Sequence, residues 1–244
     1  MPPQPDPRWA YFLDIDGTLV ALAGSPDRAR LEPAFRHVLE RVNRSTGGAV
    51  ALISGRSIRD IDRLLGGLRF PAAGQHGLER RNSSGRTSRP RVATPGLGRA
   101  RDRLCEAVER HPGLLLEDKG LSLALHYRQA PRLAGYAHRL IRSLVSGLGP
   151  AFCVQRGKRV VELRPAGRDK GIAMLEFMEE PPFRGRVPVF IGDDLTDEHA
   201  FATVNGLAGW SVKVGPGPSA ARWRLRDVPA VQRWLERIPT DQVQ

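Results

Sequence analysis

The stretch Tyr11-Phe-Leu-Asp-Ile-Asp-Gly-Thr-Leu-Val20 carries two carboxylates, Asp14 and Asp16, at the end of an apolar run. The run over residues 10–15 is typical of a buried strand. Burial of an unpaired carboxylate costs several kcal/mol, so two of them in one short segment require positively charged groups beside them. The stretch therefore predicts a polar site at a strand end, with its cations supplied by the rest of the chain or by a metal.

Strand and helix patterns alternate along both ends of the chain. We expect a helix over 26–42, a strand over 49–54, a helix over 57–65, and a strand and turn over 70–77. The same rhythm returns with a helix from 170, a strand over 187–191, a helix from 196, a strand over 211–214 and a helix from 228. This order predicts an α/β fold with a doubly wound parallel sheet.

The middle of the chain follows another pattern. Residues 81–96 are rich in Ser, Arg, Pro and Gly without periodicity, which predicts a loop. Beyond it we expect a helix over 98–109, strands over 114–117 and 122–128, a helix over 131–146, and strands over 151–155 and 159–164. We therefore predict a core domain of residues 1–81 and 166–244, interrupted by an α+β domain of αββαββ order over residues 82–165.

The net charge of +12 is concentrated in the same middle segment. Residues 82–165 hold 16 Lys and Arg against 6 Asp and Glu, whereas the rest of the chain holds 22 against 20. Such a segment is suited to an anionic partner, and a catalytically silent polyanion-binding module is one alternative function. Aromatic residues are sparse there, so we expect no nucleic acid as partner. We also expect no membrane association and a cytoplasmic location, because neither a bilayer-spanning run nor a signal peptide is visible. The sequence does not reveal the oligomeric state, and a monomer is favoured.

Four polar clusters follow predicted strands or begin a predicted helix. They are Asp14 to Thr18, Ser54-Gly55-Arg56, Lys170, and Asp193-Asp194-Leu-Thr-Asp197-Glu198. Ligands of an open parallel sheet bind at the carboxyl ends of its strands, so we expect these clusters to meet. A carboxylate nucleophile, a lysine, a second carboxylic acid and a bound Mg²⁺ suit phosphoryl transfer. Asp14, Asp193 and a backbone carbonyl are the kind of ligands that Mg²⁺ prefers.

These motifs, in this order, resemble the haloacid dehalogenase (HAD) superfamily of phosphatases. The resemblance implies a Rossmann-like core, with Asp14 as the nucleophile that forms an aspartyl-phosphate and Asp16 as general acid and then base. It further implies Ser54 and Lys170 as phosphate ligands, and Mg²⁺ held by Asp14, the Asp16 carbonyl and Asp193. Asp194 and Asp197 are implied as supporting carboxylates.

The spacing of the motifs indicates where an inserted domain belongs. Only 37 residues separate Asp16 from Ser54, whereas 115 separate Ser54 from Lys170. The second gap alone is long enough for a domain. In the superfamily this position is that of a C2 cap, and the αββαββ order resembles its C2B form, which covers the active site and selects the substrate.

The whole pattern from about Tyr11 to Val214 is similar to the trehalose-6-phosphate phosphatases. Its motifs include Leu-Ile-Ser-Gly-Arg56, Gly74-Gln-His-Gly-Leu-Glu79, Glu117-Asp-Lys119, His126-Tyr-Arg128 and Arg164-Pro-Ala-Gly-Arg-Asp-Lys170. The resemblance implies a small-molecule substrate, trehalose 6-phosphate. It also implies substrate contacts from Gly55, Arg56, His76, Glu79, Lys119, His126, Arg128, Glu162 and Arg164.

Several alternatives stay open. Another sugar-phosphate phosphatase of the superfamily, acting on sucrose phosphate or a mannosyl phosphoester, fits the core motifs equally well. Ser54 to Arg56 also suits a helix cap and turn. His126, Arg128, Glu162 and Arg164 also suit the solvated face of a half-covered sheet. Asp194, Asp197 and Glu198 also suit the charges favoured at a helix N-terminus.

Overall fold

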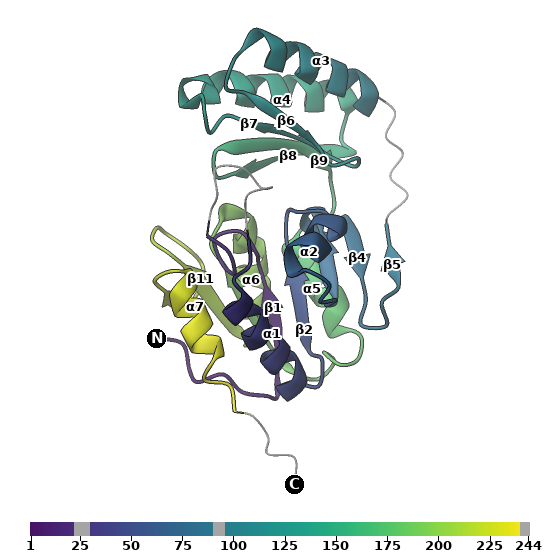
Figure 1. Ribbon diagram of the computed structural model, residues 1–244. Helices are drawn as coiled ribbons and strands as arrows, with labels where there is room; N and C mark the ends of the chain where they lie inside the picture. Colours follow the sequence, from purple (N-terminus) through teal and green to yellow (C-terminus); the bar gives the residue numbers. More distant parts are fainter. Residues whose placement is uncertain (22–29, 90–95, 240–244) are drawn as a thin grey trace. The chain divides into compact units, whose positions relative to one another are not determined.

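The computed structural model describes residues 1–21, 30–89 and 96–239. The chain forms two compact units, one of residues 1–89 and 169–244 and one of residues 90–168. Each unit has its own sheet and its own apolar core, and each is described by itself below (Figure 1).

The first unit is built on one sheet, which has eight strands among the described residues in the order β12-β11-β10-β1-β2-β3-β4-β5. Its parallel part consists of β1 (Trp9–Leu13), β2 (Val50–Ile53), β3 (Ala72–Gly74), β10 (Val187–Gly192), β11 (Trp210–Val214) and β12 (Trp223–Leu225). Strand β1 lies centrally, between β10 and β2. The predicted α/β class with a parallel sheet is confirmed.

Two layers of helices cover the sheet. Helices α1 (Pro33–Ser45), α2 (Ile58–Leu65) and α7 (Val228–Leu235) pack on one face, while α5 (Lys170–Met178) and α6 (Glu198–Gly206) pack on the other. Strand β1 alternates between the layers, with Tyr11 and Leu13 in the first core and Phe12 in the second. A strand buried on both faces reads as an apolar run, which explains why Asp14 follows such a run.

Some boundaries and elements differ from expectation. Helix α1 begins at Pro33 because Pro favours the first helical turn, and residues 26–29 of the expected helix lie outside the described ones. The expected loop over 81–96 is wrong in part, because β4 (Glu79–Arg81) and β5 (Thr87–Ser88) form an antiparallel hairpin at the sheet edge. Strand β12 was also not predicted. The strands β4, β5 and β12 are all too short to show a hydrophobic period.

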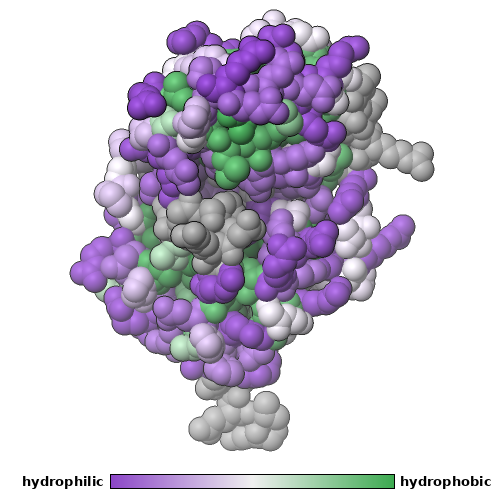
Figure 2. All heavy atoms as spheres, turned by 45° about the horizontal axis from the view of Figure 1, so that its top comes forward, coloured by the Kyte–Doolittle hydropathy of each residue, from purple (hydrophilic) through white to green (hydrophobic). Residues whose placement is uncertain are grey.

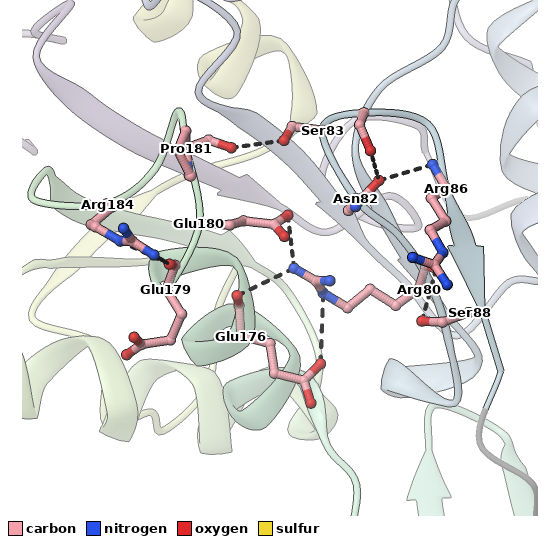
Figure 3. Close-up of polar contacts among 11 residues, drawn as sticks. Arg80, Asn82, Ser83, Arg86, Ser88, Glu176, Glu179, Glu180, Pro181 and Arg184 are labelled. Carbon is pink, nitrogen blue, oxygen red and sulfur yellow. Dashed lines mark hydrogen bonds and ion pairs between the residues drawn. The ribbon is translucent and has the colours of Figure 1, made fainter.

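Arg80 fastens this hairpin to helix α5 (Figure 3). Its guanidinium donates to the Glu176 carbonyl at 3.2 Å, pairs with the Glu180 carboxylate at 2.8 Å and lies 4.2 Å from the centre of the Phe177 ring. Ser83, in the hairpin turn, donates to the Pro181 carbonyl at 2.7 Å. The hairpin therefore contacts the C-terminal end of α5 and the residues after it, and Lys170 is the first residue of the same helix.

The second unit is an α+β layer pair. Strands β6 (Leu115–Asp118), β7 (Leu123–His126), β8 (Phe152–Gly157) and β9 (Val160–Pro165) form an antiparallel sheet in the order β6-β7-β9-β8. Helices α3 (Leu97–Arg110) and α4 (Ala134–Leu148), the latter preceded by the turn η3 (Pro131–Leu133), pack on one face through residues that include Leu104 and Ile141. The predicted αββαββ order is confirmed.

Polar residues make up most of the visible surface. On the face drawn in Figure 2, hydrophilic side chains outnumber apolar ones over most of the area. Among the described residues, no helix combines the length and the apolar character that a membrane crossing requires.

Candidate active site

The site begins where β1 and β10 end side by side. Leu13 lies opposite Ile191 in the parallel register, and the Asp14 N–H donates to the Ile191 carbonyl at 2.9 Å. This pairing sets Asp14, which follows β1, beside Asp193, which follows β10. The two segments are 178 residues apart in the chain, and their meeting is a consequence of the parallel sheet order.

Lys170 supplies a cation to this point. Its Nζ lies 2.6 Å from Asp14 Oδ1 and 2.7 Å from Asp197 Oδ1, and all three side chains are buried. Helix α5 starts here because the Asp169 carboxylate accepts from the Ile172 N–H at 2.9 Å, a regular N-cap. Gly171 permits a close approach of α5 to α6, since a Cβ there would lie 2.5 Å from Thr203 Oγ1.

A third carboxylate, that of Asp193, lies close to the two that pair with Lys170. Ligand oxygens of Asp14, Asp193 and Asp197 all lie within 4.8 Å of one another. Burial raises the pKa of Asp14 well above its usual value, and the nearby carboxylates of Asp197 and Asp193 add to the increase, although Lys170 opposes it. Burial by itself lowers the pKa of Lys170, but its pairing with Asp14 and Asp197 outweighs that effect and raises it. A divalent cation bound by these oxygens would offset the remaining negative charge, and hard oxygen donors suit Mg²⁺.

Two glycines are required for the carboxylates to come this close. A Cβ on Gly17 would lie 2.1 Å from Asp193 Oδ2, and one on Gly192 would lie 2.3 Å from the carboxyl carbon of Asp197. Gly17 also has a φ of +86°, which L-residues rarely adopt. The Gly17 of the opening stretch therefore makes room for a carboxylate from the other strand.

Asp16, the second carboxylate of the opening stretch, turns to a different cation. Arg56 Nε and the second guanidinium nitrogen lie 2.7 and 2.6 Å from its two oxygens, a bidentate pair. The structure therefore connects the first two predicted clusters through this pair. Ser54, buried at the end of β2, accepts from the Arg56 N–H at 3.2 Å, as expected of a residue that organises a turn.

The predicted residues that follow β3 form a tight turn. Gln75 and His76 have φ values of +48° and +55° in the turn η2 (Gln75–Gly77). Gly55 makes room for the buried His76 ring, because a Cβ on it would lie 2.7 Å from His76 Nε2. The Glu79 carboxylate accepts from the Ile58 N–H at 2.9 Å and from Gln75 Nε2 at 2.8 Å. Glu79 therefore binds the N-terminus of α2. The resemblance implied only a substrate contact for this residue.

The remaining predicted residues lie in the second unit, on the sheet face opposite its helices. Glu162 is central to them, accepting from Lys119 Nζ at 3.2 Å and from Ser122 Oγ at 2.5 Å. On the same face, His126 Nε2 lies 2.8 Å from the Glu117 carboxylate, and Arg164 donates to the Arg168 carbonyl at 2.6 Å. This face carries several groups of paired polar side chains, as the alternation of the strands predicted.

Arg128 lies two residues beyond the end of β7 (Leu123–His126). It lines a hollow of the second unit together with Pro131, Lys158 and Arg159. The basic side chains come from the turn after β7 and from the turn between β8 and β9, where Arg159 has a φ of +68°.

Two functional contacts were not foreseen. Asp197, expected as a supporting carboxylate, is also a member of the oxygen cluster that could hold a metal. Lys213, which was not among the predicted residues, is buried and donates from Nζ to the Asp193 carbonyl. A lysine within the predicted strand over 211–214, between Val212 and Val214, was the available signal. Asp194 caps the turn η4 (Leu195–Asp197) in a capping box with Asp197. This contact corresponds to the alternative of a charge at a helix N-terminus.

Comparison with known proteins agrees with this geometry. The family model described as "Trehalose-phosphatase" matches residues 12–229. A trehalose-6-phosphate phosphatase of Escherichia coli (strain K12) is 43% identical over 238 residues, which cover 98% of this chain and 89% of that protein.

Solved structures show a common fold. The C-terminal domain of a trehalose-6-phosphate phosphatase from C. albicans has a TM-score of 0.81 at 21% identity, over 92% of this chain and 89% of that chain. BT1666 from Bacteroides thetaiotaomicron, described among phosphatases of the haloalkanoate (HAD) superfamily, has a TM-score of 0.64 at 15% identity, over 93% and 92% of the two chains. The fold is therefore that of HAD phosphatases.

Proposed function

The chain belongs to the trehalose-phosphatase family, and from this membership and its site we propose that it hydrolyses trehalose 6-phosphate to trehalose and phosphate. The observation that carries the chemistry is the contact of Asp14 with Lys170 at the meeting point of β1 and β10. A carboxylate nucleophile beside a buried ammonium is suited to attack on phosphorus, because the ammonium stabilises the charge that develops on the phosphoryl oxygens.

Two half-reactions follow from the roles proposed for the aspartates. Asp14 attacks the phosphorus and forms an aspartyl-phosphate, while Asp16 protonates the departing sugar oxygen. Asp16 then removes a proton from the water whose oxygen attacks the phosphorus, which breaks the acyl phosphate bond, frees Asp14 and phosphate, and leaves Asp16 protonated for the next cycle. The Arg56 guanidinium donates to both Asp16 oxygens and fixes the orientation of this carboxyl group, and the base half of the role uses the ionised form that such a pair favours.

A magnesium ion fits the donor set. Asp14, Asp193 and Asp197 offer the carboxylate oxygens, and we propose that Asp14 and Asp193, with the Asp16 carbonyl, are the protein ligands. A bound Mg²⁺ would supply charge stabilisation to the phosphoryl group. Ser54 and Lys170 are proposed to bind the phosphate oxygens.

We propose that the polar sheet face of the second unit recognises the sugar. Its network offers donors and acceptors that suit hydroxyl groups, with Glu162 as the central acceptor. The proposed substrate contacts there are Lys119, His126, Arg128, Glu162 and Arg164; those proposed in the first unit are Gly55, Arg56, His76 and Glu79. The net positive charge of the segment favours a doubly anionic substrate.

A panel of phosphorylated sugars tests the proposal. Phosphate release with Mg²⁺ is measured for trehalose 6-phosphate, sucrose phosphate, a mannosyl phosphoester and glucose 6-phosphate. We expect the highest kcat/KM for trehalose 6-phosphate, and comparable values for all four would contradict the substrate assignment.

The Asp14→Asn variant tests the nucleophile. We expect kcat to fall by at least about a thousand-fold, since removal of a nucleophile costs that much or more. The fold should be kept because Asn is isosteric, and circular dichroism checks this. Asp6→Asn, which alters a carboxylate paired with Arg8 on the surface, is the control and should keep full activity. Appreciable turnover by Asp14→Asn would refute the assignment.

A further inference from the structure

We propose that Lys213 is a positioning residue for Asp193 and sets the affinity of the site for its divalent cation. The inference deepens the proposed function, because it concerns the metal on which that function rests. Lys213 lies in β11 between two core residues, Val212 and Val214.

Lys213 lies in the middle of a buried strand. Strand β11 runs beside β10, and Lys213 lies opposite Gly192, the residue that precedes Asp193. The neighbours Val212 and Val214 are in the core beneath α1 and α7, so Lys213 points to the opposite face of the sheet. Its exposure is only 6%. Lysine is almost never buried to this extent unless it is paired, so its contact is informative.

The contact of Lys213 is with a backbone group of the acidic cluster. Its Nζ donates to the Asp193 carbonyl. In the part of the chain that the structure describes, no ion pair within 4.0 Å joins it to a carboxylate, in contrast to Lys170. The ammonium of Lys213 therefore acts on the main chain of Asp193.

Asp193 is thereby fixed from two sides. From one side Gly17 leaves only enough space for its carboxylate, and from the other Lys213 holds its carbonyl. Groups that orient a metal ligand in this way typically change metal affinity by about 10- to 100-fold when they are lost.

The test compares Lys213→Met, which removes the donor and the charge but keeps an unbranched side chain, with Lys213→Arg, which keeps a donor. Ser211→Ala is the matched control, because Ser211 is a buried polar residue two positions earlier on the same face of β11. Binding of Mg²⁺ is measured by calorimetry without substrate, and the Mg²⁺ dependence of phosphate release is measured separately.

We expect Lys213→Met to bind Mg²⁺ about 10- to 100-fold more weakly, with kcat restored to within a few-fold of the wild type at saturating Mg²⁺. Lys213→Arg should recover part of the affinity, and Ser211→Ala should bind Mg²⁺ as the wild type does. If Lys213→Met does not fold, Lys213→Gln is used; its amide is uncharged and ends one atom short of the position of Nζ, so it should also bind Mg²⁺ more weakly than the wild type.

Unchanged Mg²⁺ affinity in the Met or Gln variant would overturn the proposal. An equal loss in Ser211→Ala would also overturn it, because it would show a general disturbance of the strand. A wild type that binds Mg²⁺ but releases no phosphate from trehalose 6-phosphate would refute the proposed function and leave this inference standing.

Discussion

The ammonium of Lys170 lies 2.6 Å from Asp14 Oδ1 and 2.7 Å from Asp197 Oδ1, with all three groups buried. This contact balances part of the charge of the carboxylates that end β1 and β10. It explains how the chain can place Asp14 at the end of a strand that is buried on both faces. The balance is between residues 156 positions apart, so it exists only in the folded chain.

Lys170→Met should therefore impair both stability and catalysis. Removal of one partner of a buried ion pair leaves an uncompensated charge and typically costs about 3–5 kcal/mol in the free energy of unfolding. Urea unfolding measures this loss, and phosphate release should fall to the background of the assay. Lys158→Ala, on the exposed turn between β8 and β9, is the control and should change stability by no more than about 0.5 kcal/mol. A Lys170→Met protein as stable as this control would contradict the role assigned to the pair.

Gly17 provides a test of the packing against Asp193. Gly17 and Gly85 have φ values of +86° and +82°, but a Cβ at Gly85 would meet nothing within 4 Å. Alanine at either position must adopt the left-handed backbone conformation, which lowers the free energy of unfolding by about 1–2 kcal/mol. Only Gly17→Ala would also push the Asp193 carboxylate away from Asp14, since its Cβ would lie 2.1 Å from Asp193 Oδ2.

We therefore expect Gly17→Ala to lose at least about 100-fold in kcat/KM, because misplacement by about 1 Å can cost that much. Gly85→Ala should keep the activity of the wild type. Steady-state kinetics and thermal unfolding of both variants separate the two effects. Equal activity of the two variants would show that the close approach of Gly17 to Asp193 does not matter for turnover.

The sequence predicted the core site better than its surroundings. The carboxyl ends of parallel strands meet at one edge, so Asp14, Lys170 and Asp193 could be grouped from the βα rhythm and the order of the motifs alone. The hairpin of β4 and β5 could not be predicted in this way, because its pairing depends on contacts such as that of Arg80 with α5. Local periodicity carries no information on such distant partners.

Individual side chains were harder to assign than faces. The strand alternation correctly placed His126 and Glu162 on one polar face, but it could not show that Glu162 binds Ser122 and Lys119. Likewise, nothing in the segment that contains Glu79 shows that its carboxylate accepts from the N–H of Ile58, 21 residues earlier. These contacts depend on how separate elements pack.

Arg128 provides a test of sugar recognition. Its side chain lines a hollow with two other basic residues, Lys158 and Arg159, in the unit proposed to bind the sugar. We expect Arg128→Ala to raise KM for trehalose 6-phosphate about tenfold or more, and to change KM for a small aryl phosphate by less than about twofold, because a lost contact to the remote part of a substrate is absent from the small one. Arg142→Ala, which removes an arginine from the exposed face of α4, is the control. Equal effects on both substrates would show that Arg128 does not contact the sugar.

The pair of Glu117 and His126 predicts a pH dependence of stability. Burial tends to raise the pKa of Glu117, but its hydrogen bond to His126 and the charge of Lys119 outweigh burial and lower it. A carboxyl group whose pKa is lower in the folded state contributes stability above its unfolded pKa, 4.5, and loses that contribution as the pH falls through its folded value.

Glu117→Gln should therefore be less stable than the wild type at pH 7, by at most about 1 kcal/mol because the pair is partly exposed. The difference should shrink as the pH falls below about 4.5, where the wild-type carboxyl takes up its proton. Urea midpoints of the two proteins, measured from pH 7 down to about pH 3, follow this convergence through the folded pKa, which lies below 4.5. Glu106→Gln, at an exposed pair with Arg110 on α3, is the control and should show no such trend. A difference between Glu117→Gln and the wild type that stays constant with pH would mean that the charge of Glu117 contributes nothing and that only the shape of its side chain matters.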